Sequence, residues 1–282
     1  MLRLEARPQP SKAMSLASPL IALVLTTIIG IALFALLGKD PVKGLQVFFV
    51  EPLKNARALS ELSVKAVPLV LTALGLAVCF RSNLWNIGAE GQFIVGALAG
   101  GWVALQAQPD SSRGIVVLIL AAGVLGGMVW AGITALLRDR FNASEILVSL
   151  MLVYVAEMLL SYLVYGPWKD PKGFNFPQTI TFLEPTKIPR LVDGLRANIG
   201  VLIALVAVGG FTAFLFRTYR GFALQVGGLA PAAALYAGFS SRGALWTALL
   251  VSGGMAGLAG ALEAAGPLGQ LTPYVPVGYG FA

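Results

Sequence analysis

The sequence predicts an all-α fold, a polytopic transmembrane helical bundle in which about seven spans are visible. Two observations predict it. Hydrophobic residues make up 57% of the 282 residues and charged residues only 12%, whereas soluble domains carry about twice that share of charge. The apolar residues also gather in runs with few charges, and the first run has about 20 uncharged residues, the helix length that crosses roughly 30 Å of hydrocarbon. Lipid must therefore surround most of the molecule.

The first of these runs, residues 17–37, follows a basic segment of residues 1–16. A cleaved signal peptide is the alternative. However, the run is longer than an ordinary signal core, and Gly38-Lys39-Asp40 offers no small-residue cleavage site. We therefore predict an uncleaved anchor, with residues 1–16 as a cytoplasmic N-terminal segment and residues 17–282 as the transmembrane domain.

Six further apolar runs predict the remaining spans. The run that follows Gln92 is short and rich in glycine, which favours a broken or tilted helix buried among the others. Residues 266–282 form a stretch rich in Gly and Pro without a polar tail, so we expect the chain to be truncated at its C-terminus. The six runs are residues 62–80, 93–107, 115–137, 146–165, 199–216 and 244–265.

Arginine in the short connections predicts the orientation of the bundle. Arg138 and Arg140 share one short turn, and Arg217, Arg220 and Arg242 lie in a segment that contains no acidic residue. Short cytoplasmic loops are enriched in Lys and Arg. We therefore expect both connections, and with them the N-terminus, inside the cell.

Glycine recurs at a spacing of four residues in three of the predicted spans. Small residues at this spacing let helix backbones approach closely in a membrane, where apolar burial gives helices no reason to associate. We therefore predict that these glycines pack helices together. The pairs are Gly96/Gly100, Gly123/Gly127 and Gly253/Gly257.

The residue inventory excludes several chemistries. There is no His and one Cys, Cys79, which excludes His/Cys metal sites, disulfides and Cys-His catalysis. No G-x-x-x-x-G-K-[ST] sequence is present, so the chain cannot cradle ATP phosphates by that motif. The net charge of +7 comes from Lys and Arg spread singly, which argues against nucleic acid. We expect no enzyme activity and no bound metal or cofactor.

The polar segment FRSNLWNIGAEGQF, residues 80–93, lies between two predicted spans. Asn86, Glu90 and Gln92 would be costly at membrane depth unless they face a cavity or a partner, and the glycines among them would permit an unwound turn. A plain cytoplasmic loop is the alternative. Glu157, within a span, is a further functional candidate. These four residues are our candidates for a substrate pathway.

Residues 218–243 form a second informative segment. Small residues with Pro231, flanked by Gly228 and Gly238, suit a short helix that lies across the membrane surface between two turns. Such a helix could dock into a groove on a soluble partner. An ordinary connecting loop is the alternative.

Three motifs carry a resemblance to a known family: NIGAEGQ at residues 86–92, SEILVSLMLVYVA at 144–156 and GPWKDPKGFNFPQ at 166–178. Together they resemble the permease subunits of bacterial ABC importers for nucleosides and related simple sugars, within the branched-chain amino acid/sugar permease superfamily. The likeness runs from about residue 62 to the end.

The resemblance implies a multi-pass subunit of the bacterial plasma (inner) membrane. Its partners would be an ABC ATPase subunit, a second permease subunit, membrane lipid and a substrate-binding lipoprotein that delivers the small-molecule substrate. ATP and Mg would bind the partner subunits, so that this chain would hold no cofactor. Members of the family continue with further helices beyond the equivalent of Ala282.

The resemblance also assigns roles to two loops. The outer loop, residues 166–198, would contact the binding protein through Trp168, Lys169 and Asp170. The coupling loop, residues 218–243, would contact the ATPase. Ala230, Ala232 and Leu235 depart from the family pattern there, where Asn, Glu and Arg are frequent. The positions that match the pattern are Gly228, Pro231, Ala233, Ala234, Tyr236, Ala237 and Gly238.

Two alternatives from other classes stay open on sequence alone. One is a secondary transporter in which Glu157 carries protons and the substrate binds near broken helices. The other is a membrane scaffold that transports nothing. Uptake that survives loss of ATP but collapses with the proton gradient would indicate the secondary transporter.

Overall fold

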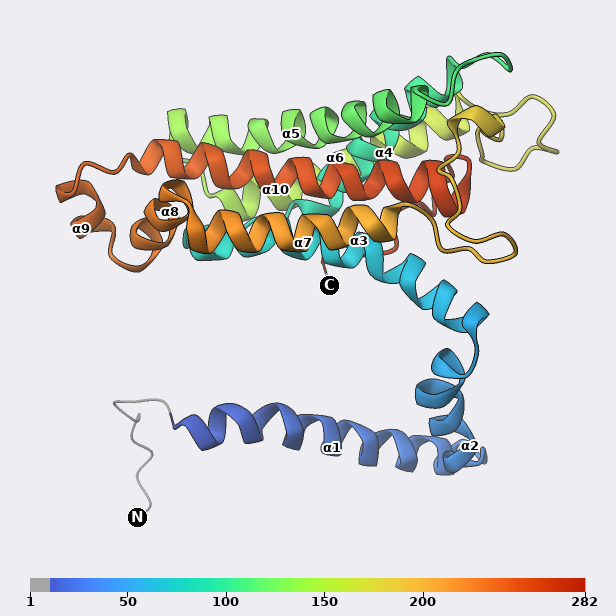
Figure 1. The fold of residues 1–282 in the computed structure, drawn as a ribbon, viewed down its shortest axis with the longest axis horizontal. Coiled ribbons are helices and arrows are strands. Elements are labelled where there is room, and N and C mark those ends of the chain that lie inside the picture. The colour runs from blue at the N-terminus through green and yellow to red at the C-terminus, as the bar shows by residue number, and fades with distance from the viewer. Residues whose placement is uncertain (1–10, 282) are drawn as a thin grey trace. The chain divides into compact units, whose positions relative to one another are not determined.

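The structure, a computed structural model, describes residues 11–281. The chain divides into two compact units, with the boundary between Leu59 and Ser60, and each is described here by itself. Helix α3 (Ala56–Arg81) begins in the first unit and continues through the second. Figure 1 shows the helices that make up both units.

The first unit contains one long apolar helix and three short helical turns. Ser11 caps α1 by accepting a hydrogen bond from the backbone N–H of Met14. None of the most apolar stretch of α1 is buried, as expected for a helix surrounded by lipid. Asp40 caps the turns that follow. The elements are α1 (Lys12–Leu36), α2 (Pro41–Leu45), η1 (Gln46–Val50) and η2 (Glu51–Leu53).

The second unit is a helical bundle. Within the described residues, six helices of the chain are long and apolar enough to cross a membrane, and α4 is a shorter apolar helix. These seven helices coincide with the seven predicted runs, so the predicted all-α transmembrane bundle is confirmed. Besides α3, the elements are α4 (Ala89–Leu105), α5 (Ile115–Phe141), α6 (Glu145–Tyr165), η3 (Glu184–Thr186), α7 (Gly200–Arg217), α8 (Tyr219–Leu229), α9 (Pro231–Tyr236), α10 (Ser241–Glu263) and η4 (Ala264–Leu268).

Helices α4, α5 and α10 meet through glycine. A Cβ placed on Gly96 would lie 2.2 Å from the Cα of Gly257, and one placed on Gly127 would lie 2.1 Å from the carbonyl oxygen of Gly253. No side chain fits at such distances, so the helix backbones touch. The prediction that the spaced glycines pack helices is confirmed.

Helix α4 is short and buried, as predicted, but its start differs from the prediction. It begins at Ala89, four residues before the predicted run, so that Glu90 and Gln92 belong to its first turn and Gly91 is helical. A carboxylate is favourable near a helix N-terminus, which carries partial positive charge. The non-helical turn is confined to residues 82–88.

A return segment, residues 269–281, follows η4 and packs back into the bundle without forming a helix. Leu271, Val275 and Tyr279 are buried in the main core. The segment also pairs with the loop between α6 and α7, because the N–H of Thr179 donates to the carbonyl of Leu271 over 3.0 Å.

Candidate functional site

Residues 218–243 fold into two short helices. Thr218 caps α8, since its hydroxyl accepts a hydrogen bond from the N–H of Gly221 over 3.0 Å. The backbone leaves helical geometry at Ala230, and Pro231 then starts α9. Gly238 has a φ of +81°, a value that suits glycine and lets the chain turn toward α10. Figure 1 shows both helices at the end of the bundle where α10 begins.

The seven predicted coupling positions lie on or beside α9 and at the end of α8. Tyr236 is 97% exposed, and its ring contacts no other part of the bundle closely enough to bury it. Ala234 is the buried position of α9, and it holds this helix against the bundle. Pro231, Ala233, Ala237 and Gly238 are exposed. The structure therefore presents one face of α9 outward.

Gly228 connects α8 to the end of α3. A Cβ on Gly228 would lie 2.3 Å from the carbonyl oxygen of Arg81 and 3.0 Å from the N–H nitrogen of Asn83. Arg81 itself reaches Gln225 of α8, with its Nη1 3.4 Å from Oε1. Helix α8 thus rests directly on the residues that open the non-helical turn 82–88.

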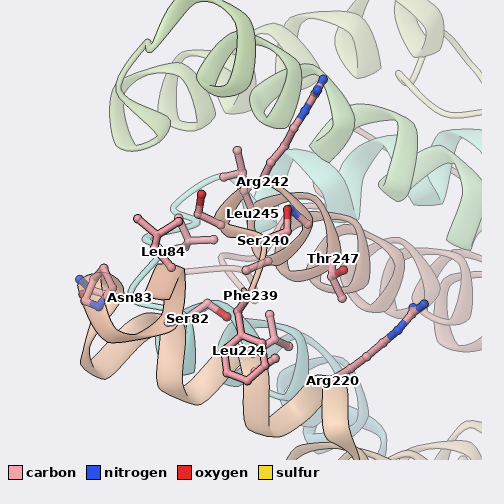
Figure 2. A pocket seen from close by; sticks show the side chains of 18 of the residues that line it. Ser82, Asn83, Leu84, Arg220, Leu224, Phe239, Ser240, Arg242, Leu245 and Thr247 are labelled. Carbon is pink, nitrogen blue, oxygen red and sulfur yellow. The ribbon is translucent and has the colours of Figure 1, made fainter. Parts of the chain in front are cut away.

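A cavity of about 760 Å³ lies between this turn, α8, α9 and the start of α10. Figure 2 shows Leu224, Phe239 and Leu245 gathered together, with the side chains of Arg220 and Arg242 extending away from them. Arg242 pairs with Asp139 of α5 over 2.7 Å, which ties the start of α10 to the end of α5.

From Asn83 the turn runs into the middle of the bundle. The side-chain Nδ2 of Asn86 donates to the hydroxyl of Ser252 over 2.9 Å. Ser252 lies eleven residues from each end of α10, so Asn86 sits about halfway along that helix. Asn86 is buried there. The segment 80–93 is therefore mostly buried from Asn86 onward, whereas Phe80 and Trp85 at its start are exposed.

Asn86 and Gln92 form a closed pair. Asn86 Nδ2 lies 2.9 Å from Gln92 Oε1, and Gln92 Nε2 lies 3.0 Å from Asn86 Oδ1. Asn86 Oδ1 also accepts from the N–H of Gly88. Buried amides are tolerated when they are paired in this way. The pair fixes the turn 82–88 to the start of α4.

Glu90 does not bond to Asn86 or Gln92, although it lies on the same turn of α4 as Gln92. Its carboxylate accepts hydrogen bonds from the backbone N–H groups of Gly278 over 2.9 Å and of Gly280 over 2.5 Å. Glu90 is buried and holds the return segment in place. Glu157, the fourth pathway candidate, is half-buried on α6, and its side chain has no hydrogen bond or ion pair within the described residues.

The three predicted contact residues of the outer loop are half-buried and shape the loop. Trp168 packs against the main core. Lys169 donates to the side chain of Asn175, and Asp170 accepts from the N–H of Lys172 over 2.8 Å.

Further along the outer loop, the side-chain hydrogen bond from Lys187 lowers the pKa of the Glu184 carboxyl. The exposed aromatic side chains of this loop are those of Phe174 and Phe176.

Five residues were missed by the sequence analysis: Ser252, Gly278 and Gly280, which bind the predicted side chains, and Lys65 and Tyr279, whose side chains bond to each other. A charged residue inside the apolar run 62–80 was a signal for Lys65. The others are partners from distant parts of the chain, and no local pattern marks them. Within the described residues, no group of three His, Cys, Asp or Glu side chains is placed to hold a metal ion.

Comparison with known proteins gives the context for this geometry. The family described as "Branched-chain amino acid transport system / permease component" matches residues 58–282. A glucose ABC transporter permease protein of Haloferax volcanii is 36% identical over 290 residues, covering 99% of this chain and 76% of the relative. A nucleoside ABC transporter permease protein of Lactococcus lactis and a guanosine ABC transporter permease protein of Bacillus subtilis are each 29% identical, covering 89% and 88% of this chain and 71% of each relative. No solved structure matches.

The bundle and its short end helices define a multi-pass membrane protein of the transport class, a permease subunit of an ABC transporter. This chain belongs to the family of branched-chain amino acid transport system permease components. Membership implies partnership with an ATPase and with a substrate-binding component.

Proposed function

We propose that this chain is one permease subunit of an ATP-driven importer for simple sugars or nucleosides. The exposed helix α9, in a chain of the ABC permease family, is the observation that carries the proposal. The cargo class follows from the relatives, whose names specify glucose, nucleosides and guanosine. This chain would supply the shape of the pathway and do no bond chemistry.

The orientation that fits this function places α8 and α9 in the cytoplasm, where ATP is found. Six arginines lie at this end of the bundle, in or beside short connections. With α1 as one crossing and α3 as the next, the N-terminus is also cytoplasmic, and the bilayer is the plasma membrane. The six are Arg81, Arg138, Arg140, Arg217, Arg220 and Arg242.

The partners are then a pair of ATPase subunits that bind ATP and Mg, a second permease and a substrate-binding lipoprotein outside. The ATPase contacts the outward face of α9 through Tyr236, Pro231, Ala233, Ala237 and Gly238. The lipoprotein contacts the outer loop that Trp168, Lys169 and Asp170 shape. Support for the latter is that Lys169 and Asp170 make hydrogen bonds within this loop, and that Phe174 and Phe176 of the same loop are exposed.

Coupling would follow the contacts between α9 and the centre of the bundle. ATP-driven closure of the ATPase pair would displace α9 and α8. Because Gly228 is in direct backbone contact with Arg81 and Asn83, this displacement would also move those two residues. Asn86 lies three residues further along. Movement of the turn 82–88 would then open the pathway beside Asn86, Glu90, Gln92 and Glu157.

Uptake measured with the partner ATPase tests the proposal. In vesicles that contain the chain and its partner subunits, we expect glucose or guanosine uptake to require ATP. Tyr236→Ala should reduce uptake at least tenfold, about 1.4 kcal/mol of coupling, while ATP hydrolysis continues. Tyr162→Ala on α6 is the matched control, since Tyr162 is also exposed but lies outside the coupling loop.

Two results would contradict the proposal. Uptake that continues without ATP and stops when the proton gradient is dissipated would identify a secondary transporter. Normal ATP-driven uptake by the Tyr236→Ala variant would remove α9 from the coupling mechanism.

A further inference from the structure

One carboxylate oxygen near the end of α5 accepts three N–H groups from the start of α10, and the inference drawn from it rests on the proposed transport function. Oδ2 of Asp139 lies 2.8 Å from Nε and 2.7 Å from Nη2 of Arg242, and 3.2 Å from Nε1 of Trp246. Arg242 and Trp246 are four residues apart, so they lie on the same face of α10. Hydrogen bonds to a charged acceptor are stronger than neutral ones. Asp139 therefore fixes the beginning of α10 to α5.

The beginning of α10 is also the place where the coupling loop ends. Four residues separate the end of α9 from the start of α10. The N–H of Phe239 donates to the carbonyl of Ala234 on α9 over 2.9 Å, and the hydroxyl of Ser240 accepts from the N–H of Gly243 on α10 over 3.0 Å. Because this short connection is hydrogen-bonded to both helices, a displacement of α9 reaches the first turn of α10.

Helices α5 and α10 are joined a second time, further along the bundle. A Cβ on Gly127 would lie 2.1 Å from the carbonyl oxygen of Gly253, and a Cβ on Gly257 would lie 2.2 Å from the carbonyl oxygen of Gly123. Figure 1 shows the two helices side by side. Close-packed contacts of this kind transmit displacement because they have no space to absorb it. Two helices held together at one end and along their length move as one body.

The contact of Gly228 with Arg81 and Asn83 leads from α8 to α3, on the side where α9 begins. The contact at Asp139 gives a second route, from the side where α9 ends. We propose that Asp139 is a positioning residue for transport, whose ion pair with Arg242 makes α5 follow the displacement of α9. Without this pair, the beginning of α10 is released from α5, and part of the displacement is lost before it reaches the glycine contacts.

The ratio of solute imported to ATP hydrolysed tests this role, in vesicles that contain the chain and its partner subunits. The solute is glucose or guanosine, whichever the unaltered transporter carries. Asp139→Ala should lower the ratio at least about fivefold, since ATP is still hydrolysed while α5 no longer follows α9. Arg242→Ala should lower it equally. The two changes combined should lower it no further than either alone, because both remove the same contact.

Glu145→Ala is the matched control. Glu145 pairs with Arg138 over 3.3 Å, and its side chain is 13% exposed, against 11% for Asp139. This pair joins α5 to the start of α6 and not to the coupling loop. We expect Glu145→Ala to keep the ratio within about twofold of the unaltered value. A purely structural role for Asp139 would lower the melting temperature of both variants and leave both ratios unchanged.

A milder variant keeps the test decisive. Asp139→Asn retains the shape of the side chain and removes its charge, so it replaces Asp139→Ala if that variant does not assemble with its partner subunits. Its ratio should fall at least about threefold, because an uncharged oxygen holds the three N–H groups less strongly. Ratios for the Asp139 variants within about twofold of the Glu145→Ala value would overturn the proposal.

Failure of the proposed function gives a different result. Uptake by the unaltered transporter would then continue without ATP, and the proposed function and the role of Asp139 would fall together. ATP-driven uptake that Tyr236→Ala reduces and the Asp139 variants leave intact would refute the role of Asp139 alone.

Discussion

Glu90 is the single residue on which the position of the return segment depends most directly. It is a buried carboxylate, and both of its oxygen atoms accept a backbone N–H. Hydrogen bonds to a charged group are stronger than those between neutral groups. Any substitution here affects two segments that are 188 or more residues apart in the chain.

Glu90→Gln tests this role. The amide keeps one acceptor and places an NH₂ group against the other N–H, so we expect a loss of about 2–3 kcal/mol of stability. The measurement is the apparent melting temperature in detergent micelles. Glu157→Gln is the control, because the Glu157 side chain has no hydrogen bond or ion pair within the described residues, and its change should stay within about 0.5 kcal/mol. Equal shifts in the two variants would contradict the assigned role of Glu90.

Sequence reasoning found Asn86, Glu90 and Gln92 because polar residues stand out between apolar spans. It could not tell that Asn86 and Gln92 pair with each other while Glu90 binds the return segment. Asn86 lies in the turn 82–88, whereas Glu90 and Gln92 lie in the first turn of α4, and the directions of the last two side chains depend on where α4 begins. Their partners Ser252, Gly278 and Gly280 come from distant parts of the chain, and a single sequence contains no signal for such contacts.

Among the helices, the contact of α4 and α5 with α10 is the tightest part of the bundle. The glycines bring backbone atoms together, so any added side chain must displace a whole helix. Gly257 lies between α4 and α5, because a Cβ on Gly96 would lie 2.2 Å from its Cα and a Cβ on Gly257 would lie 2.2 Å from the carbonyl oxygen of Gly123.

Gly257→Ala tests this packing. Its Cβ would lie 2.2 Å from the carbonyl oxygen of Gly123, and neither backbone can give way, so we expect a loss of about 1–3 kcal/mol. Gly209→Ala on α7 is the control. Nothing lies within 4 Å of a Cβ there, and alanine favours a helix by up to about 1 kcal/mol. The measurement is again the melting temperature in detergent, and a neutral Gly257→Ala would contradict the close approach.

The helices themselves were largely predictable, because a transmembrane span is defined by length and lack of charge, and both are properties of a local window. The starts of α4 and α9 were harder to place. Glu90 and Gln92 are polar, so a hydrophobicity pattern places the start of the helix after them. In the structure the helix already begins at Ala89 and includes both residues. Whether α9 is a helix or a loop depends on six residues, too few for a periodic pattern.

For the whole molecule, the exposed apolar surface of the helices determines whether the chain stays dispersed in water. Helices α1, α5, α6 and α7 leave most of their apolar surface uncovered, with at most 22% of the most apolar stretch buried in any of them. Such a surface is stable only in lipid or detergent. We expect the purified chain to sediment as an aggregate when detergent is removed and to remain dispersed in lipid nanodiscs. Analytical ultracentrifugation measures both, and a compact monomer in plain buffer would refute the membrane assignment.

The glycine contacts between α4, α5 and α10 also limit where this protein can be altered. Where backbones touch, there are no side chains to enlarge or shrink, so a new cargo cannot be accommodated by remodelling that junction. A change of selectivity in this chain therefore requires positions whose side chains have free space around them.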